Sequence, residues 1–264
     1  MFFTLNKNSF IKFLCIILFF FLLSLLLVFI INLLTLKNLS KTNPTIPQKN
    51  INTIETSSLP ISNKTIILDA GHGLPDGGAV SNNASNIIES SLNLNIVFKL
   101  QELLELSNIN VILTRSDENG IYEETSNSIR DKKISDMKNR VQISKDYPAD
   151  LFISIHMNKL ENTSVKGFQV FYSPKHKSAK HSAKYIQDNL NNSIDEFKNT
   201  KKIKEINGIY LTKHIEIPFI LIECGFLSNE FETNLLTQNE YQEKIAWGIY
   251  TGIIDSLNKP NLID

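Results

Sequence analysis

Cysteine is scarce in this sequence, which contains two cysteines among 264 residues. Cys15 lies in a strongly apolar segment near the N-terminus, whereas Cys224 lies in the C-terminal part of the chain. The part that contains Cys224 therefore has no second cysteine with which to form a disulfide. A domain of about 200 residues can bury enough apolar surface to be stable without one, so we expect its stability to come from a hydrophobic core.

An excess of charge is also missing, because 27 basic residues balance 27 acidic residues. Residues 1–60 contain five lysines and one glutamate, which leaves residues 61–264 with a net charge of −4. Proteins that bind nucleic acids need clustered lysine and arginine to contact phosphates. The charge balance therefore argues against a nucleic acid as a partner.

Phosphate-binding signatures are absent from the most glycine-rich stretch, Thr65–Val80, which reads TIILDAGHGLPDGGAV. It has neither the GxGxxG spacing nor a GK[ST] ending. The stretch begins as a buried strand and continues into a loop in which His72 stands between two glycines. Glycine lets a backbone bend tightly, so the imidazole of His72 can project into a crevice beyond the end of the strand.

Charged residues are missing from Phe13 to Ile31, where Ser24 is the one polar interruption. At about 1.5 Å per residue, a helix of this length nearly crosses a hydrocarbon core of about 30 Å. No A-x-A-like cleavage pattern follows, so we expect an uncleaved transmembrane signal anchor at residues 13–36, after a short tail at residues 1–12. Residues 37–63, rich in Pro, Asn, Thr and Ser, read as a linker to a single domain at residues 64–264.

Lysines on both sides of the apolar segment leave its orientation undecided. Lys7 and Lys12 precede the segment, and Lys37 and Lys41 follow it, so the positive-inside rule gives no preference. We expect a single-pass protein of the cytoplasmic membrane with its domain on the extracytoplasmic side. This expectation rests on the function argued below.

Residues 64–264 alternate between strand and helix patterns and contain no internal repeat. Short apolar runs predict strands, and apolar residues at helical spacing predict helices. Strands separated by helices favour an α/β fold with a mostly parallel, twisted sheet and helices on both faces. The predicted strands are Ile66–Asp69, Asn110–Thr114, Leu151–Ile155, Phe168–Tyr172 and Pro218–Ile222, and the predicted helices are Ile87–Ser107, Ser135–Lys145, Ser178–Leu190 and Tyr241–Leu257.

Four residues that can carry chemistry lie next to the ends of these elements. His72, His156 and Glu223 each follow a predicted strand, and Glu89 opens the helix after the His72 loop. Two histidines and a carboxylate form a known set of ligands for catalytic zinc, which leaves one position for water. The remaining carboxylate can act as a general base on that water, and zinc chemistry of this kind suits the hydrolysis of an amide.

Each of these residues also has a purely structural interpretation. A lone histidine at a strand end is more often a hydrogen-bonded structural group than a ligand, and Glu89 can simply favour a helix N-terminus. Glu223 follows an apolar run, where an isolated carboxylate is costly to bury. The four residues together are harder to explain by structure than any one of them, so a functional site is favoured.

Other polar residues are candidates for supporting roles or for none. Asp69 and Asp76 flank His72 and can hydrogen-bond its loop or orient a ligand. Arg115 and Asn158, which also follow predicted strands, can position a substrate or brace the site.

The remaining histidines and Cys224 lack a comparable setting. His176 and His181 lie in a lysine-rich stretch and are expected to be solvated, whereas His214 has no feature that indicates a role. Cys224 is expected to pack as a small apolar residue, since no base accompanies it in the sequence.

These motifs resemble the zinc-dependent N-acetylmuramoyl-L-alanine amidases. LDAGHGLPDGGAV, a helix-opening glutamate followed by LNLNI, VILTR, ADLFISIHMN and ECGFLSN occur in that family's order from about Thr65 to Leu257. The resemblance implies a zinc-exopeptidase-like sheet, Zn²⁺ bound by His72, Glu89 and His156, and Glu223 as the catalytic acid and base. The implied substrate is peptidoglycan, at the amide between N-acetylmuramic acid and the L-alanine of the stem peptide.

One departure from the family pattern concerns the loop before the helix. The run SNNASNIIESS stands where the family commonly has a glycine-rich run followed by Glu-Lys. Glu89 is nevertheless the one acidic residue between Asp76 and Glu102, so its assignment is unaffected. The substrate contacts of this loop are less defined.

A membrane anchor joined to a bare catalytic domain is similar to the germination-specific, spore-cortex amidases of endospore formers. That resemblance implies removal of stem peptides so that muramic δ-lactam can form, with the domain in the forespore intermembrane space. A protein activator is a further expectation without an identity.

Two other functions remain open from the residues alone. One is a zinc peptidase of carboxypeptidase-like architecture that acts on stem peptides, since the metal chemistry is the same. The other is a non-catalytic wall-binding module, against which the presence of all four chemical residues argues.

Overall fold

The computed structural model describes residue 24, residues 63–82 and residues 85–259. The chain divides into two compact units, Met1–Glu55 and Thr56–Asp264, and every element named below belongs to the second. The predicted anchor at residues 13–36 lies outside the described residues except for Ser24, as does nearly all of the linker. Among the described residues, no helix is both long and apolar enough to span a membrane.

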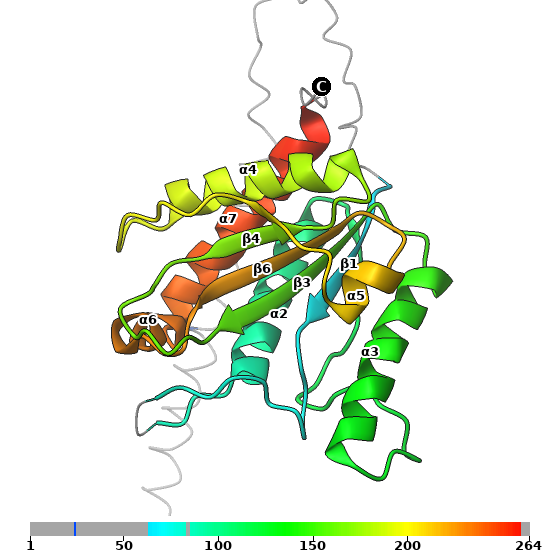
Figure 1. The fold of residues 1–264 in the computed structure, drawn as a ribbon. Helices are drawn as coiled ribbons and strands as arrows, with labels where there is room; N and C mark the ends of the chain where they lie inside the picture. Colours follow the sequence, from blue (N-terminus) through cyan, green and yellow to red (C-terminus); the bar gives the residue numbers. More distant parts are fainter. Residues whose placement is uncertain (1–23, 25–62, 83–84, 260–264) are drawn as a thin grey trace, which may run out of the picture. The chain divides into compact units, whose positions relative to one another are not determined.

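A six-stranded sheet in the order β2-β1-β3-β6-β4-β5 forms the centre of the second unit (Figure 1). Strands β2, β1, β3 and β6 are parallel, whereas β4 runs antiparallel to β6, and β5 runs parallel to β4. The sheet is therefore mixed, with its parallel part on one side. The strands are β1 (Thr65–Ala70), β2 (Asn110–Leu113), β3 (Leu151–Asn158), β4 (Gln169–Tyr172), β5 (Lys204–Glu205) and β6 (Phe219–Phe226).

Helices cover both faces of this sheet because side chains alternate along each strand. Leu68 of β1 and Ile153 of β3 contribute to a core that includes residues of α2, α4 and α7. Ile67 and Phe152 point the other way and belong to a smaller core with residues of α3 and α5 (Figure 1). The helices are α2 (Glu89–Leu106), α3 (Ile129–Asp146), α4 (Lys177–Ser193), α5 (Tyr210–His214), α6 (Glu230–Leu236) and α7 (Asn239–Asn258).

Helix α3 begins at Ile129, earlier than its predicted start at Ser135. The hydroxyl of Ser128 accepts a hydrogen bond from the backbone N–H of Asp131 at 3.1 Å and so caps the first turn. Only four residues of α3 are buried, and three of them are polar. The apolar periodicity of this helix is therefore weak, which explains why its first turns were not predicted.

Three short elements were not predicted, namely β5, α5 and α6. Strand β5 pairs with β4 over two residues, which is too short for any alternating pattern to appear in the sequence. Helix α6 does have a start signal, because the side chain of Asn229 accepts from the N–H of Glu232 at 3.0 Å. Both α5 and α6 are shorter than a sequence window that can detect helical spacing.

Candidate metal centre

The parallel strands β1, β3 and β6 bring three of the predicted site residues to one edge of the sheet. His72 follows β1 after Gly71, His156 lies within β3, and Glu223 lies within β6 directly opposite His156 in the strand register. The prediction that His156 and Glu223 follow their strands was wrong, because both strands continue past them. Both side chains therefore project from the sheet itself, which holds them more firmly than a loop.

His72, Glu89 and His156 form a cluster whose ligand atoms all lie within 4.8 Å of one another. Oε1 of Glu89 is 3.3 Å from Nε2 of His72 and 3.0 Å from Nδ1 of His156. The two imidazole rings meet edge to face, with their centroids 5.0 Å apart. The three predicted ligands, which are separated by up to 84 positions along the chain, are therefore close enough to share one cation.

The carboxylate of Glu89 is held in place from several sides. Its Oε2 accepts the N–H of Ala79 at 2.7 Å, and its Oε1 accepts the N–H of Met157 at 3.1 Å. Burial would raise the pKa of Glu89, but hydrogen bonds and charge from the two histidines hold that pKa well below its ordinary value. Glu89 is thus ionised and oriented, as a metal ligand must be.

Asp76 orients the other side of the His72 ring. Nδ1 of His72 donates to Oδ2 of Asp76 at 3.2 Å, and Nζ of Lys133 is 2.9 Å from the second oxygen of Asp76. Burial alone would lower the pKa of His72, but Asp76 and Glu89 raise it to about 9. Two carboxylates therefore favour a positive charge at this ring, and a carboxylate behind a histidine is a common support for a metal ligand.

Two glycines are required by the close packing of this cluster. A Cβ atom on Gly71 would collide with the imidazole of His156, and a Cβ atom on Gly78 would collide with Glu89 and His72. Gly78 also has a φ of 72°, a value that residues with a side chain rarely adopt. His72 itself has a φ of 62°, so the turn that presents it is unusual for a residue other than glycine.

Glu223 faces the same site but has a different environment. Its Oε2 atom is buried and has no hydrogen-bond partner within the part of the chain that the structure describes. Burial raises the pKa of Glu223 to about 7. Together with His72 and His156, Glu223 lines a cavity of about 430 Å³, so its carboxylate can exchange a proton with a group bound there.

Beneath the site, Asp69 and Arg140 form a buried ion pair. Asp69 also accepts hydrogen bonds from the hydroxyls of Thr114 at 2.7 Å and Ser154 at 2.5 Å. Burial would raise the pKa of Asp69, but the charge of Arg140 and these hydroxyls hold it below its ordinary value. Arg140 in turn donates to the carbonyl oxygen of His72 at 2.6 Å, so Asp69 supports the His72 loop through Arg140.

Arg140 was not predicted, although the sequence contains a signal for it. Lys133, Asp136, Met137 and Arg140 all line the cavity, and their spacing places them on one face of α3. The opposite wall is apolar and was also missed. It consists of side chains from β4, β6, α5 and the segment that leads into α5, including Phe171, Leu221, Ile206, Ile209 and Leu211.

Arg115 and Asn158 do not face this cavity. Arg115 is buried and donates to four backbone carbonyl groups, those of Ala70, Gly71, Ser90 and Asp117, so of its two predicted roles the structure shows bracing. Asn158 accepts the N–H of Lys159 at 2.7 Å and has no contact with the cluster among its recorded hydrogen bonds.

The other predictions had mixed outcomes. His181 is buried at 4% exposure and lies within 3.3 Å of the carbonyl oxygen of Ser256, so the expectation that it is solvated was wrong. His214 stacks on Tyr210 with ring centroids 4.1 Å apart. Cys224 is fully buried and unpaired, as expected of a packed apolar residue.

Known proteins resemble this chain over most of its length. The sequence pattern of the family described as N-acetylmuramoyl-L-alanine amidase (Amidase_3) matches residues 66–255. The germination-specific N-acetylmuramoyl-L-alanine amidase of Bacillus subtilis is 39% identical over 197 residues, which cover 75% of this chain and 81% of that protein. The amidase LytC of B. subtilis is 28% identical over 197 residues and is covered over 36% of its length.

A solved structure extends the comparison to three dimensions. The CwlD amidase from Clostridioides difficile, determined in complex with the GerS lipoprotein, superposes with a TM-score of 0.71 at 46% sequence identity, over 74% of this chain and 98% of that chain. The family pattern spans the strands and helices that carry His72, Glu89, His156 and Glu223. The site and the comparisons agree, and the chain belongs to the family of N-acetylmuramoyl-L-alanine amidases.

Proposed function

We propose that this amidase is zinc-dependent and that it hydrolyses the amide between N-acetylmuramic acid and L-alanine in the peptidoglycan of the spore cortex. The observation that carries the proposal is the arrangement of Glu223 in the cavity. Glu223, whose Oε2 is buried and has no hydrogen-bond partner among the described residues, lines the same cavity as His72 and His156, beside a three-residue ligand cluster.

The donor set fits zinc. One carboxylate oxygen and two imidazole nitrogens are the ligands of many catalytic zinc sites that keep a position open. Nε2 of His72, Oε1 of Glu89 and Nδ1 of His156 are the atoms that converge here. When bound, zinc polarises the amide carbonyl group and lowers the pKa of water to about 7.

Glu223 supplies the proton transfers. Its carboxylate takes a proton from the attacking water and returns it to the nitrogen of the departing L-alanine. A pKa of about 7 suits both steps, because an efficient acid–base group titrates near the working pH.

The surrounding residues keep the ligands in place. Asp76 fixes the ring of His72, and the backbone N–H groups of Ala79 and Met157 fix Glu89. Arg115 and Arg140 both bind carbonyl groups of the turn at residues 70–72. Because these contacts are already formed, the ligand side chains need little reorganisation during the reaction.

The spore-cortex assignment is supported by similarity to the germination-specific amidase of B. subtilis. By that similarity, the enzyme removes stem peptides so that muramic δ-lactam can form. The C. difficile relative was solved with a lipoprotein, and we propose that a membrane-attached protein also binds this chain.

The domain would then lie on the extracytoplasmic side of a membrane, behind the anchor predicted at residues 13–36. Protease added to intact vegetative cells that express the full chain tests this placement. Cleavage of the domain that occurs only after the cytoplasm has been opened would contradict it.

Metal analysis combined with product identification tests the proposed activity. Purified full-length protein should contain one equivalent of zinc, and mass spectrometry of digested cortex should show stem peptides with a free N-terminal L-alanine. Shortened stems that remain attached to muramic acid would instead identify a peptidase. A protein without stoichiometric zinc under all conditions would identify a non-catalytic module.

A further inference from the structure

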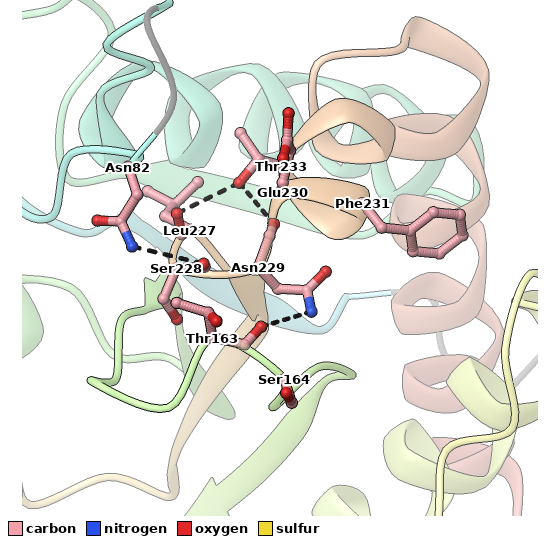
Figure 2. Close-up of a pocket in the computed structure, with 9 residues that line it drawn as sticks. All are labelled: Asn82, Thr163, Ser164, Leu227, Ser228, Asn229, Glu230, Phe231 and Thr233. Atoms are coloured by element: carbon pink, nitrogen blue, oxygen red, sulfur yellow. Dashed lines mark hydrogen bonds between the residues drawn. The ribbon is translucent and has the colours of Figure 1, made fainter.

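A second cavity lies at the same edge of the sheet as the metal centre. It has a volume of about 570 Å³ and is formed by three segments that are distant in sequence (Figure 2). These are the segment after β1, the loop between β3 and β4, and the turn between β6 and α6. Its polar lining includes Asn82, Thr163, Ser164, Ser228 and Asn229. We refer to it as the edge groove.

The edge groove is near enough to the metal centre for one polymer to occupy both. The N–H of Ala79 donates to Glu89. Asn82 is three residues further along the chain, so the Cα atoms of Ala79 and Asn82 are at most about 11 Å apart. Glu223 and Ser228 are five residues apart on β6 and the turn after it, a separation of at most about 18 Å. These upper limits correspond to the length of a few sugar rings or amino acids.

The two sides of the edge groove are fastened to one another. Nδ2 of Asn229 donates to the carbonyl oxygen of Thr163 at 2.8 Å, and the N–H of Leu160 donates to the hydroxyl of Ser228 at 3.2 Å. Figure 2 shows these segments facing each other across the groove. The groove is therefore formed by tertiary contacts and does not depend on a single loop.

The lining of the edge groove combines polar groups with the apolar side chains of Leu227 and Phe231. Lys166 stands beside it, with Nζ 5.3 Å from the centroid of the Phe231 ring. The lining has hydroxyl groups and one carboxylate, from Glu230, and its residues include no cationic side chain.

The amide of Asn229 is engaged with Thr163 and Glu232, and Nδ2 of Asn82 donates to the carbonyl oxygen of Ser228 at 3.5 Å, which leaves Oδ1 of Asn82 for a ligand. Thr163 and Ser164 are exposed, and their hydroxyls have no hydrogen-bond partner among the described residues. Such groups can hydrogen-bond the hydroxyl and acetamide groups of sugar rings.

The cavity at the metal centre has a different character. Lys133, whose side chain is 48% exposed, stands at its border, and an apolar wall lies opposite. A stem peptide carries free carboxylates and apolar side chains, whereas N-acetylated sugar rings carry neither. A carboxylate is favoured near Lys133 and disfavoured near Glu230.

We infer that the edge groove binds the glycan strand on the muramic acid side of the scissile amide, while the cavity between α3 and α5 receives the stem peptide. This inference rests on the proposed function, because it assigns the two halves of that substrate to two cavities. The site is a neutral oligosaccharide site, and it selects substrates with more than one sugar.

Steady-state kinetics with two substrates tests the inference on the full chain. One substrate is polymeric peptidoglycan, and the other is a single N-acetylmuramoyl residue joined to its peptide. Ser164→Trp fills the groove and should raise KM for the polymer by about tenfold, which corresponds to about 1.4 kcal/mol, with kcat unchanged. Asn82→Ala should raise it by about threefold, in line with the loss of one hydrogen bond.

Matched controls are Thr200→Trp and Asn192→Ala, which alter exposed residues outside both cavities. Neither should change KM for either substrate, and no variant should change KM for the single-sugar substrate. Equal effects of Ser164→Trp on both substrates, or no effect on the polymer, would overturn the inference.

Direct binding separates this inference from the proposed activity. Full-length Glu223→Gln protein should bind an N-acetylglucosamine tetrasaccharide, and adding Ser164→Trp should abolish that binding while binding of free stem peptide persists. Loss of peptide binding instead would show that the groove takes peptide and would overturn the inference. If wild-type protein releases no L-alanine peptide from any substrate, the proposed function fails. The tetrasaccharide titration still tests whether the edge groove binds glycan.

Discussion

Asp69 and Glu223 are two carboxylates on the same face of one sheet, and they have opposite environments. Asp69 on β1 is fully buried and is bound by Arg140, Thr114 and Ser154. Glu223 on β6 has a buried oxygen that finds no hydrogen-bond partner in the part of the chain that the structure describes. The pKa of Asp69 is therefore held low, whereas burial raises the pKa of Glu223 to about 7.

The difference shows how one sheet provides both a support and a reactive group. A buried carboxylate with a cation and hydroxyl donors stays ionised and holds its neighbours in place. A buried carboxylate without donors stays ready to accept and release a proton. The strand register decides which of the two environments each residue receives.

Replacing Glu223 by glutamine should have the largest effect on activity. Glu223→Gln keeps the shape of the side chain but cannot accept a proton, so turnover should fall by about 10²- to 10⁴-fold. Zinc content measured by atomic emission should stay near that of the wild type, because Glu223 is outside the ligand cluster. Normal turnover in Glu223→Gln would show that the carboxylate of Glu223, like that of Asp69, has only a structural role.

Replacing Asp69 should affect folding more than any other single change at the site. Asp69→Asn removes one of the two carboxylates that pair with the buried Arg140, the other being Asp136, which should lower the free energy of unfolding by about 2 kcal/mol. Urea denaturation measures this change. The control is Asp188→Asn, which removes an exposed ion pair to Lys184 and should cost less than about 0.5 kcal/mol. Similar losses in both variants would contradict the structural role of Asp69.

Replacing Asp76 should weaken metal binding without removing it. Asp76→Asn removes the carboxylate that orients the ring of His72, and the loss of such a support typically lowers metal affinity by about 10- to 100-fold. Competition with a chelator measures the affinity. Asp146→Asn, at the exposed far end of α3, serves as the control and should match the wild type. An unchanged affinity for Asp76→Asn would exclude Asp76 as a support.

Removing a single hydroxyl beside Asp69 should have the smallest effect, and that effect should depend on pH. Ser154→Ala removes a hydrogen bond to an ionised carboxylate, which should cost about 1.5 kcal/mol of unfolding free energy at neutral pH. The pKa of Asp69 is lower in the folded protein than the ordinary value of 3.8. The contribution is therefore complete above pH 3.8 and is lost as the pH falls through the folded pKa.

Denaturation of wild type and Ser154→Ala at several pH values measures that dependence. The control is Ser144→Ala, because the hydroxyl of Ser144 bonds to the carbonyl oxygen of Val141 within its own helix. Its effect should not vary with pH. A difference between Ser154→Ala and wild type that widened as the pH fell would contradict this dependence on an ionised Asp69.

Prediction from the sequence succeeded where a local pattern carried the information. The strands that hold Asp69 and His156 are mainly apolar, and Glu89 opens a helix with clear apolar spacing. The predicted ligand roles of His72, Glu89 and His156 stay predictions, but their meeting in space is observed. The polar helix α3 has a weaker apolar pattern, and α5 is too short to show one. The part of the cavity wall that these two helices form was therefore not foreseen.

The sequence alone determined the motifs and the alternation of strands and helices. Each motif and each of these elements is encoded by residues that lie within a few positions of one another. Tertiary structure alone decided that Arg140 pairs with Asp69 across 71 positions and that Glu223 lies opposite His156 without a donor of its own. It also decided that three distant segments form the edge groove. The physical reason is that these features depend on strand order and register, which bring together side chains that no local pattern connects.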